Sequence, residues 1–288
     1  MFPESTMTKL KSAVLILLVG LIMPTNTLGQ IQVVNGIDYR PDEEIAKGRD
    51  LLDIYMPSGA SRVPVIVYFH GGALMNGDRV DNEAIGTRIA SLGIGFVGPT
   101  YRMSPDVSHP QHAVDAATAF KWVVDNIDSF GGDPENLYIA GHSAGAYLAA
   151  LLAYDAEYLE SVNVPPASIK GAILLSPFLY VEETAPVRIE WGVGAETIWG
   201  SDPEGWLDAS ISQLVAPSQV RTILIYADGD DDWRKGQIKR LRDEMNNAGR
   251  NEIDMIEVSD RTHGSLNSSA LKEDDVVGPI FIQFIQAK

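Results

Sequence analysis

The sequence predicts an α/β domain in which a mostly parallel central sheet carries helices on both faces. Short apolar runs rich in β-branched residues alternate with stretches whose apolar residues recur at helical spacing. Such alternation is typical of βαβ units, in which each crossover helix covers the sheet. The chain has 288 residues, which suits one such domain with a substantial buried core.

The expected strands are short and apolar, and the first two lie at the edge of the sheet. They are Ile31–Tyr39, Leu51–Tyr55, Val63–Phe69, Ile94–Pro99, Leu137–Ala140, Ile169–Ser176, Thr222–Ala227 and Ile253–Val258. The expected helices between and after them are Arg79–Leu92, Pro110–Ile127, Ala144–Tyr154, Trp233–Asn247 and Asp274–Ala287.

The stretch Pro177–Gln219 does not fit this alternation. It contains Trp191, Trp199 and Trp206 together with four glycines and several prolines. A long irregular insertion in a compact domain is usually a lid or a binding loop. We therefore expect a short irregular insertion that forms a partial lid. The alternative is a surface excursion that only packs on the scaffold.

The N-terminus has the order of a secretory signal peptide. Lys9 and Lys11 precede the apolar run Ala13–Met23, and small residues around Gly29 suit cleavage. We expect residues 1–29 to be a signal peptide, residues 30–288 to be the mature domain, and the protein to be secreted or periplasmic. An uncleaved membrane anchor is the alternative, although the run is short for a membrane span. After cleavage we expect no stable membrane association.

Charge and cysteine content exclude several classes of function. The formal net charge is −17, from 22 basic and 39 acidic residues, so the surface repels nucleic acid and anionic lipid. We expect a small-molecule partner and no nucleic acid. There is no cysteine, which excludes disulfides, thiolate metal sites and a cysteine nucleophile. No His/Asp/Glu cluster has ligand spacing, so we expect neither a metal nor an organic cofactor.

The strongest chemical signal is the pentapeptide Gly141-His142-Ser143-Ala144-Gly145, which joins the strand Leu137–Ala140 to the helix Ala144–Tyr154. In a G-x-S-x-G elbow of this kind, a sharp turn holds the serine hydroxyl above the sheet, and small flanking residues let strand and helix approach. The N–H of Ala144 then lies at a helix N-terminus, where it stabilises an anion. Ser143 is the candidate nucleophile.

A serine nucleophile needs a base, and position selects one histidine of five. His142 lies inside the elbow and His70 belongs to a glycine turn. His109 and His112 lie at the start of the expected helix Pro110–Ile127, before the serine. Only His263 follows Ser143, in a loop after the strand Ile253–Val258. Because such triads run in the order serine, acid, histidine, His263 is the candidate base. For His109 and His112 we expect a helix-entry or surface role.

The acid should follow the strand Thr222–Ala227, where Asp228, Asp230, Asp231 and Asp232 crowd one loop. One buried carboxylate is needed to orient the imidazole. Position favours Asp230, with Asp231 second, and the remaining acids fit solvated turns or helix caps. Asp260 is too close to His263 in sequence to be the usual partner.

The turn His70-Gly71-Gly72-Ala73 ends the strand Val63–Phe69, and its glycines allow a close approach to a substrate. The backbone N–H groups of Gly72 and Ala73, with that of Ala144, are the candidate oxyanion hole. A turn without a catalytic role is the alternative.

From about Leu51 to Lys288, the chain resembles the esterase and arylformamidase-like branch of the α/β-hydrolase superfamily, which carries an HGG motif. It is most similar to feruloyl-esterase-like carboxylesterases. The residues that carry the resemblance are Asp53-Ile54-Tyr55-Met56-Pro57, His70-Gly71-Gly72, Gly77-Asp78, Tyr101-Arg102-Met103-Ser104-Pro105, Gly131-Gly132-Asp133-Pro134, Gly141-His142-Ser143-Ala144-Gly145 and His263-Gly264-Ser265-Leu266.

The resemblance implies an α/β-hydrolase catalytic domain over residues 30–288 that cleaves carboxylic esters through an acyl-serine intermediate. Counting back from Gln237 in the family's pattern again selects Asp230 as the acid. The chain departs from the family where Ala73-Leu74-Met75 replaces a further glycine or aromatic residue and a tryptophan, and where Asp231 replaces a proline.

The motif places several apolar residues around the elbow, and we expect them to form a pocket for short or aromatic acyl groups. They are Leu74, Met75, Tyr101, Tyr147 and Phe178, with Trp191 from the insertion. The alternative is that these side chains belong to the core.

Two other functions stay open on the sequence. The same triad serves an amide hydrolase, such as a formamidase or a small peptidase. A binding protein that has kept the scaffold without catalysis is the alternative of another class, although the intact Ser143, Asp230 and His263 argue against it.

Overall fold

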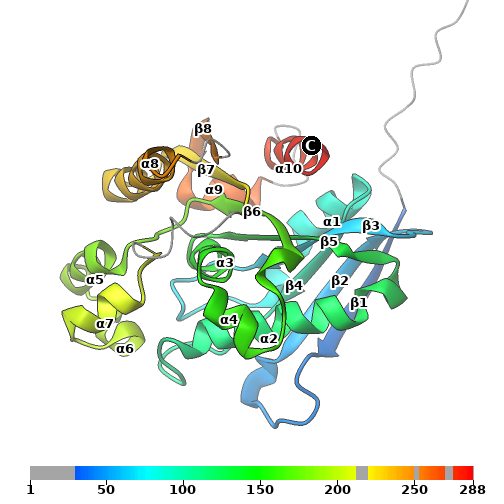
Figure 1. The fold of residues 1–288 in the computed structure, drawn as a ribbon, viewed down its shortest axis with the longest axis horizontal. Helices are drawn as coiled ribbons and strands as arrows, with labels where there is room; N and C mark the ends of the chain where they lie inside the picture. Colours follow the sequence, from blue (N-terminus) through cyan, green and yellow to red (C-terminus); the bar gives the residue numbers. More distant parts are fainter. Residues whose placement is uncertain (1–29, 212–219, 250–252, 270–274, 288) are drawn as a thin grey trace, which may run out of the picture.

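The computed structural model describes residues 30–211, 220–249, 253–269 and 275–287. Its centre is a sheet with the strand order β1-β2-β4-β3-β5-β6-β7-β8 (Figure 1). The strands are β1 (Ile31–Asp38), β2 (Leu51–Pro57), β3 (Val63–Phe69), β4 (Gly95–Pro99), β5 (Gly132–His142), β6 (Ile169–Leu175), β7 (Thr222–Gly229) and β8 (Ile253–Thr262). The signal peptide predicted over residues 1–29 lies outside the described residues.

The sheet is mostly parallel, which confirms the predicted fold class. β2 is antiparallel to both β1 and β4, whereas β3 pairs in parallel with β4 and β5, and β5 to β8 continue in parallel. The predicted edge position fits β1, which is mostly exposed, while β2 lies one strand further in and is buried over most of its length. Phe69 at the end of β3 pairs with Gly141 near the end of β5, so both strands finish at the same edge.

Helices cover both faces of the sheet (Figure 1). The longer helices are α1 (Glu83–Ser91), α2 (Gln111–Asn126), α3 (Ala144–Tyr154), α8 (Asp232–Asn247) and α10 (Val277–Gln286), with the short helices α4 (Ala156–Ser161) and α9 (His263–Ser268) and 3-10 turns at Ala46–Gly48, Arg79–Asn82, Ile127–Phe130 and Pro166–Ser168. One core cluster takes residues from α2, α3 and α8, and the other takes residues from α1, α9 and α10.

Helix α3 is the most deeply placed of these elements. All of its residues are buried, and six of its eleven are alanine or glycine. Small side chains let the helix axis approach the sheet closely, so its first turn sits directly against the ends of β3 and β5. The elbow that begins α3 is therefore fixed by the interior of the protein rather than by a surface loop.

The insertion after β6 is more regular than predicted. Its described part contains three helices, α5 (Val181–Glu190) and the shorter α6 (Ala195–Trp199) and α7 (Pro203–Asp208). Asp202 caps α7 by accepting a hydrogen bond from the N–H of Glu204 at 3.1 Å. α6 and α7 have five and six residues, too few to show periodicity in sequence, and α5 contains Pro186, so the pattern predicted an irregular stretch.

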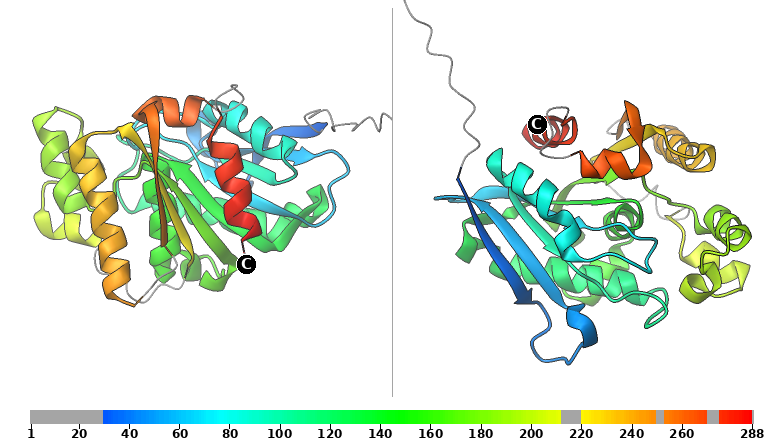
Figure 2. Two further views of the ribbon diagram at one scale, coloured as in Figure 1. Left: turned by 90° about the horizontal axis from the view of Figure 1, so that it is seen from above. Right: turned by 180° about the vertical axis from the view of Figure 1, so that it is seen from behind.

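These three helices gather at one end of the sheet, beside α8 (Figure 2). We call α5, α6 and α7 the cap. The last eight residues of the predicted insertion, 212–219, lie outside the described residues. Within the ranges that the structure covers, no helix combines the length and the apolar character needed to cross a bilayer.

Candidate active site

Ser143 stands between β5 and α3 in a conformation that a serine rarely adopts. Its φ and ψ are 54° and −116°, outside the ordinary regions for a residue with a side chain. Its N–H donates to the Leu175 carbonyl at 2.8 Å, and its carbonyl accepts from the Tyr147 N–H at 3.1 Å. The surrounding structure holds this strained turn, as is common at functional sites.

The two glycines of the pentapeptide are required by the close approach of neighbouring backbone. A Cβ added to Gly145 would lie 2.0 Å from the Phe69 carbonyl oxygen at the end of β3. A Cβ added to Gly141 would lie 2.4 Å from the Gly145 carbonyl. Since both obstacles are main chain, neither can move aside, and the sharp turn depends on the missing side chains.

The hydroxyl of Ser143 leads into a continuous chain of hydrogen bonds. Ser143 Oγ lies 2.9 Å from His263 Nε2, and His263 Nδ1 lies 2.7 Å from Asp230 Oδ1. The structure thus brings together the three residues predicted as nucleophile, base and acid. His263 is the first residue of α9 rather than part of a loop, and the preceding Thr262 caps that helix.

Asp230 is held by more than the imidazole. Its Oδ2 accepts the N–H of Ala227 at 2.9 Å and the hydroxyl of Ser176. Burial on its own would raise the pKa of Asp230. The hydrogen bonds from His263, Ser176 and Ala227 outweigh burial, so the pKa of this carboxyl lies below its ordinary value. Asp230 is therefore a buried, ionised partner for the imidazole.

The other acids of this loop face solvent. Asp228 accepts the N–H groups of Asp260 and Arg261, each at 3.0 Å, which lowers the pKa of its carboxyl. Asp231 is the N-cap residue of α8 but makes no capping bond with its side chain, and Asp232 begins the helix in the open. The surplus acids are solvated, as expected, but Asp231 does not cap α8 with its side chain.

The glycine turn after β3 packs directly on the elbow. A Cβ on Gly71 would lie 3.4 Å from the Ser143 Cβ, so the two turns are in contact. Gly72 and Ala73 have φ of 116° and 61°. Among the described residues, no group accepts a hydrogen bond from the N–H of Gly72, Ala73 or Ala144. Three unpaired donors beside a serine hydroxyl suit a developing negative charge.

The remaining buried histidines stay neutral. Burial lowers the pKa of His142 to about 3, and it lowers the pKa of both His70 and His112 to about 4. His112 is the second residue of α2, which fits the expected helix-entry role, but at 1% exposure it does not lie at the surface. By contrast, the side chain of His263 keeps 35% of its surface. Only His263 combines contact with Ser143 and access to solvent.

A family model described as the alpha/beta hydrolase fold matches residues 66–265. The chain belongs to the α/β-hydrolase fold family. This confirms the family predicted from the motifs, and the match includes the elbow, the acid loop and the histidine of the chain of hydrogen bonds.

Curated relatives of this hydrolase are named as esterases. Esterase LipC of Mycobacterium tuberculosis is 28% identical over 232 residues, which cover 74% of this chain and 56% of LipC. Esterase LipQ of the same organism is 41% identical over 114 residues, or 38% of this chain and 27% of LipQ. Isoprenylcysteine alpha-carbonyl methylesterase ICME of Arabidopsis thaliana is 36% identical over 44% of this chain and 31% of ICME. The hydrolase thus spans between about a quarter and just over half of these relatives.

Solved structures share the fold. An inhibited esterase B from Lactobacillus rhamnosis superposes with a TM-score of 0.75 at 19% identity, covering 88% of this hydrolase and 86% of that chain. A truncated carbohydrate esterase from gut microbiota has a TM-score of 0.72 at 18% identity, with 91% and 97% covered.

Most of the residues predicted to line a pocket belong to the core of the hydrolase. Leu74, Tyr101, Tyr147 and Phe178 have no exposed surface, so they do not line an open pocket. The hydroxyl groups of the two tyrosines are hydrogen-bonded to main-chain carbonyls. The Tyr101 hydroxyl donates to the His70 carbonyl at 2.9 Å, and the Tyr147 hydroxyl donates to the Ala209 carbonyl at 2.7 Å. Buried aromatic residues fill space around the elbow instead of offering a surface to substrate.

The two other predicted pocket residues keep some exposure. Trp191 is 53% exposed at the end of α5, where its ring meets Trp233 edge to face at 6.1 Å. Met75 is partly buried, and its sulfur would lie 2.8 Å from a Cβ on Gly194. Met75 therefore links the oxyanion turn to the cap.

Sequence reasoning missed three contributors. His142 Nε2 lies 2.8 Å from the His263 carbonyl, so its neutral ring donates to the main chain of the histidine bonded to Ser143. Ser176 donates to Asp230, and Arg234 donates to the Ser176 carbonyl at 2.8 Å. The serine directly after strand β6 was the available signal for Ser176, whereas nothing in the sequence marked Arg234.

A pair of glycine substitutions tests the packing of the elbow. Gly145→Ala should lower the free energy of unfolding by at least about 2 kcal/mol, because its Cβ meets the Phe69 carbonyl. Gly236→Ala is the matched control on α8, where a Cβ meets nothing within 4 Å, and it should stabilise by about 0.5–1 kcal/mol. Urea unfolding measures both. Equal stability of the two variants would contradict this packing.

Proposed function

We propose that this α/β hydrolase is a serine carboxylesterase that hydrolyses short-chain or aromatic carboxylic esters, including esters carried on carbohydrates. The observation that carries the proposal is the unbroken path Ser143–His263–Asp230, with contacts of 2.9 and 2.7 Å. A serine is a weak nucleophile without a hydrogen-bonded base, and the base in turn needs an orienting acid.

In the proposed reaction, His263 Nε2 takes the proton of Ser143 as Oγ bonds the ester carbonyl carbon. The imidazolium then gives that proton to the leaving alcohol, which departs and leaves an acyl group on Ser143. A water molecule attacks the acyl carbon, again with His263 as base, and releases the carboxylic acid and free Ser143. Asp230, kept ionised by its hydrogen bonds, stabilises the imidazolium in both halves.

The unpaired N–H groups of Gly72, Ala73 and Ala144 supply the oxyanion hole in this reaction. The third of them begins α3, where the helix dipole adds to the stabilisation of negative charge. Preorganised donors of this kind are worth about 10² to 10³ in rate each.

Substrate class is supported by packing and by the names of relatives. The aromatic residues around the elbow have no exposed surface, so they offer no apolar surface to a long acyl chain. The relatives LipC and LipQ are named esterases, and one solved neighbour is named a carbohydrate esterase. The basic and apolar order of residues 9–23 supports a secreted or periplasmic site of action.

The acid loop tests the triad. Asp230→Asn should lower kcat by about 10⁴, because an amide does not hold the imidazole in the tautomer that accepts the Ser143 proton. Asp231→Asn is the matched control, since this neighbouring side chain faces solvent. Initial rates with 4-nitrophenyl acetate measure both. A crippled Asp231→Asn beside an active Asp230→Asn would overturn the assignment of the acid.

A series of 4-nitrophenyl esters tests the substrate class. The ratio kcat/KM for acetyl or butyryl esters should exceed that for esters of twelve or more carbons by at least about tenfold, or 1.4 kcal/mol. Formyl and acetyl anilides in the same series test amide cleavage. A rate that climbs steadily with chain length, or anilides cleaved as fast as esters, would contradict the proposed preference.

A further inference from the structure

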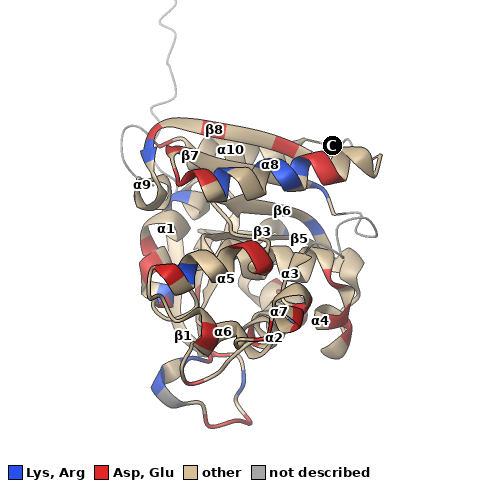
Figure 3. Ribbon diagram, turned by 90° about the vertical axis from the view of Figure 1, so that its left-hand side faces the viewer, with Lys and Arg blue, Asp and Glu red and all other residues tan. Residues whose placement is uncertain are grey.

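Arg188 is a buried cation in an otherwise acidic cap. It is the one basic residue of the helices α5, α6 and α7, and it is 5% exposed. The same helices carry six acidic residues, Glu182, Glu183, Glu190, Glu196, Glu204 and Asp208. Figure 3 colours the acidic residues of the cap red. Although acids are plentiful on its own helix, Arg188 points away from them into the protein.

The hydrogen-bonding capacity of Arg188 is mostly unused. A guanidinium has five N–H donors, and one of them donates from Nη1 to the Ala73 carbonyl at 3.2 Å. The flat group stacks over the rings of Phe178 and Trp199, with its carbon 4.5 and 4.9 Å from the ring centroids. Within the described part of the chain, no carboxylate lies within 4.0 Å of it.

The two other buried arginines of the described residues are paired. Arg40 binds Asp115 at 2.9 Å, and Arg234 lies 3.8 Å from Asp230 while donating to the Ser176 carbonyl. A buried charge normally finds a partner of opposite sign, because leaving it unpaired is costly. Arg188 departs from this pattern because it has no carboxylate partner within the described ranges. An anionic group of a ligand would supply that partner.

The free donors of Arg188 are open to solvent. Some enclosed nitrogens without a partner do occur in this protein, Nε of Arg40 among them. Nε and Nη2 of Arg188 also lack a partner in the described part of the chain, but they are not completely enclosed, so each keeps a small accessible surface. Burial lowers the pKa of Arg188 to about 10, which leaves it protonated at neutral pH. The group is thus a charged donor that is largely buried but keeps some contact with solvent.

The neighbours of Arg188 place it beside the candidate active site. Ala73, whose carbonyl it binds, belongs to the oxyanion turn. Phe178, over which it stacks, follows Ser176 by two residues, and Ser176 donates to Asp230. The Phe178 ring stacks in turn on Tyr147 at 4.6 Å, one helical turn after Ser143. Arg188 therefore contacts the oxyanion turn and the segment that follows Ser176, and the Phe178 ring separates it from Tyr147 of α3.

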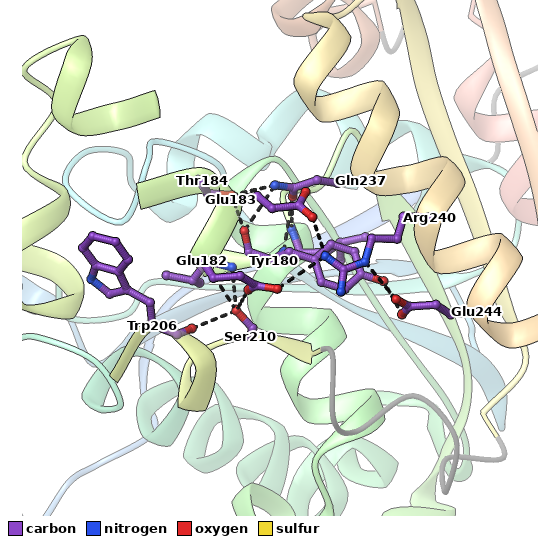
Figure 4. Close-up of polar contacts among 11 residues, drawn as sticks. Tyr180, Glu182, Glu183, Thr184, Trp206, Ser210, Gln237, Arg240 and Glu244 are labelled. Atoms are coloured by element: carbon purple, nitrogen blue, oxygen red, sulfur yellow. Dashed lines mark hydrogen bonds and ion pairs between the residues drawn. The ribbon is translucent and has the colours of Figure 1, made fainter. Parts of the chain in front are cut away.

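The helix that carries Arg188 is firmly attached to the scaffold (Figure 4). Gln237 of α8 accepts the N–H groups of Leu179 and Tyr180 at 2.8 and 3.2 Å. Ser210 accepts the N–H of Val181 at 2.7 Å, and Arg240 binds Glu182 and Glu183. Because the first turn of α5 is fixed from both sides, the position of Arg188 two turns later is preorganised for a ligand.

We propose that Arg188 is a substrate-recognition residue that binds a carboxylate carried by the ester at a distance from the bond that is cleaved. This rests on the proposed function, since Ser143 must still cleave the ester. The net reaction consumes one water molecule and releases an alcohol and an acid, one of which bears the additional carboxylate.

A carboxylate fits the site better than other anions. One guanidinium supplies one positive charge, which a carboxylate matches and a phosphate dianion exceeds. Nε and Nη2 lie on one edge of the group, and this edge is suited to two parallel bonds to a carboxylate. The net charge of −17 disfavours an anion at long range, but salt screens that repulsion beyond about 8 Å.

The test compares each carboxylate ester with its neutral amide of the same shape. Monomethyl succinate, glutarate and adipate carry the charge on the acyl side, and their ω-amide methyl esters are the neutral partners. Acetoxybutanoate and acetoxybutanamide carry out the same comparison on the alcohol side. Wild-type enzyme at pH 7 should favour the anion by at least about tenfold in kcat/KM for one of these pairs, as expected for a hydrogen-bonded charge pair.

Variants then assign the preference to Arg188. Arg188→Met should reduce the ratio of kcat/KM for the anionic ester to kcat/KM for its amide by at least tenfold. Arg188→Lys keeps the charge but loses the paired N–H donors of the guanidinium, so it should retain part of the preference. Arg242→Met, an arginine on α8 that pairs with Asp243, is the matched control and should keep the wild-type ratio. A ratio within one enzyme is insensitive to general loss of activity, and Arg188→Lys remains informative if Arg188→Met fails to fold.

The outcomes separate this inference from the proposed function. Turnover of 4-nitrophenyl acetate with no preference for the anion in any pair would overturn the role of Arg188 and leave the esterase proposal standing. A preference that survives in Arg188→Met would also overturn it. Absence of any ester hydrolysis by the wild-type protein would refute the proposed function, and the recognition role with it.

Discussion

Ser143 keeps its positive φ because three elements, β5, α3 and the end of β3, pack closely around it. The turn lies between the end of β5 and the start of α3, and the end of β3 packs against it. A Cβ on Gly145 would lie 2.0 Å from the Phe69 carbonyl oxygen of β3. Ser143 takes a φ of 54° in this turn, where both glycines lie against neighbouring backbone. The position of the Ser143 hydroxyl beside His263, the free N–H of Ala144 and the contact with Gly71 all follow from that constraint.

The chain of hydrogen bonds from Ser143 depends in turn on the register of the sheet. Ser176, Asp230 and His263 directly follow β6, β7 and β8, and all three lie at the edge where β3 and β5 also end. Parallel strands bring their carboxyl ends to one side, so residues more than a hundred positions apart meet there. Three buried histidines near this edge have pKa values lowered by burial, and the solvent-accessible His263 is the one that contacts Ser143.

The sequence predicted the scaffold and the central residues well, because both leave local signals. Buried strands are apolar runs, and the elbow has a pentapeptide between a strand and a helix. Asp230 was chosen among crowded acids by position, and the structure gives the physical distinction: only Asp230 is buried and receives hydrogen bonds from Ser176 and Ala227. Those donors come from other segments, which no local pattern reveals.

The surroundings of the site were less predictable. The sequence does not distinguish an aromatic residue that fills the core from one that faces a pocket, and the structure places Tyr147 and Phe178 in the core. Of the cap helices, α6 and α7 are too short to show a helical period, and α5 contains a proline. Arg188 reads in sequence as an ordinary charge on a helix surface, and its significance depends on its burial against Phe178 and Trp199 without a carboxylate.

The central claim is that Ser143 is an activated nucleophile, and covalent labelling tests it most directly. A fluorophosphonate probe reacts with a serine whose hydroxyl is deprotonated by a neighbouring base and whose adduct is stabilised by an oxyanion hole. Intact mass and peptide mapping should find one probe per chain, attached to Ser143, with hydrolysis of 4-nitrophenyl acetate lost in proportion to labelling. An unlabelled protein, or a probe attached to another serine while Ser143 stays free, would contradict the account.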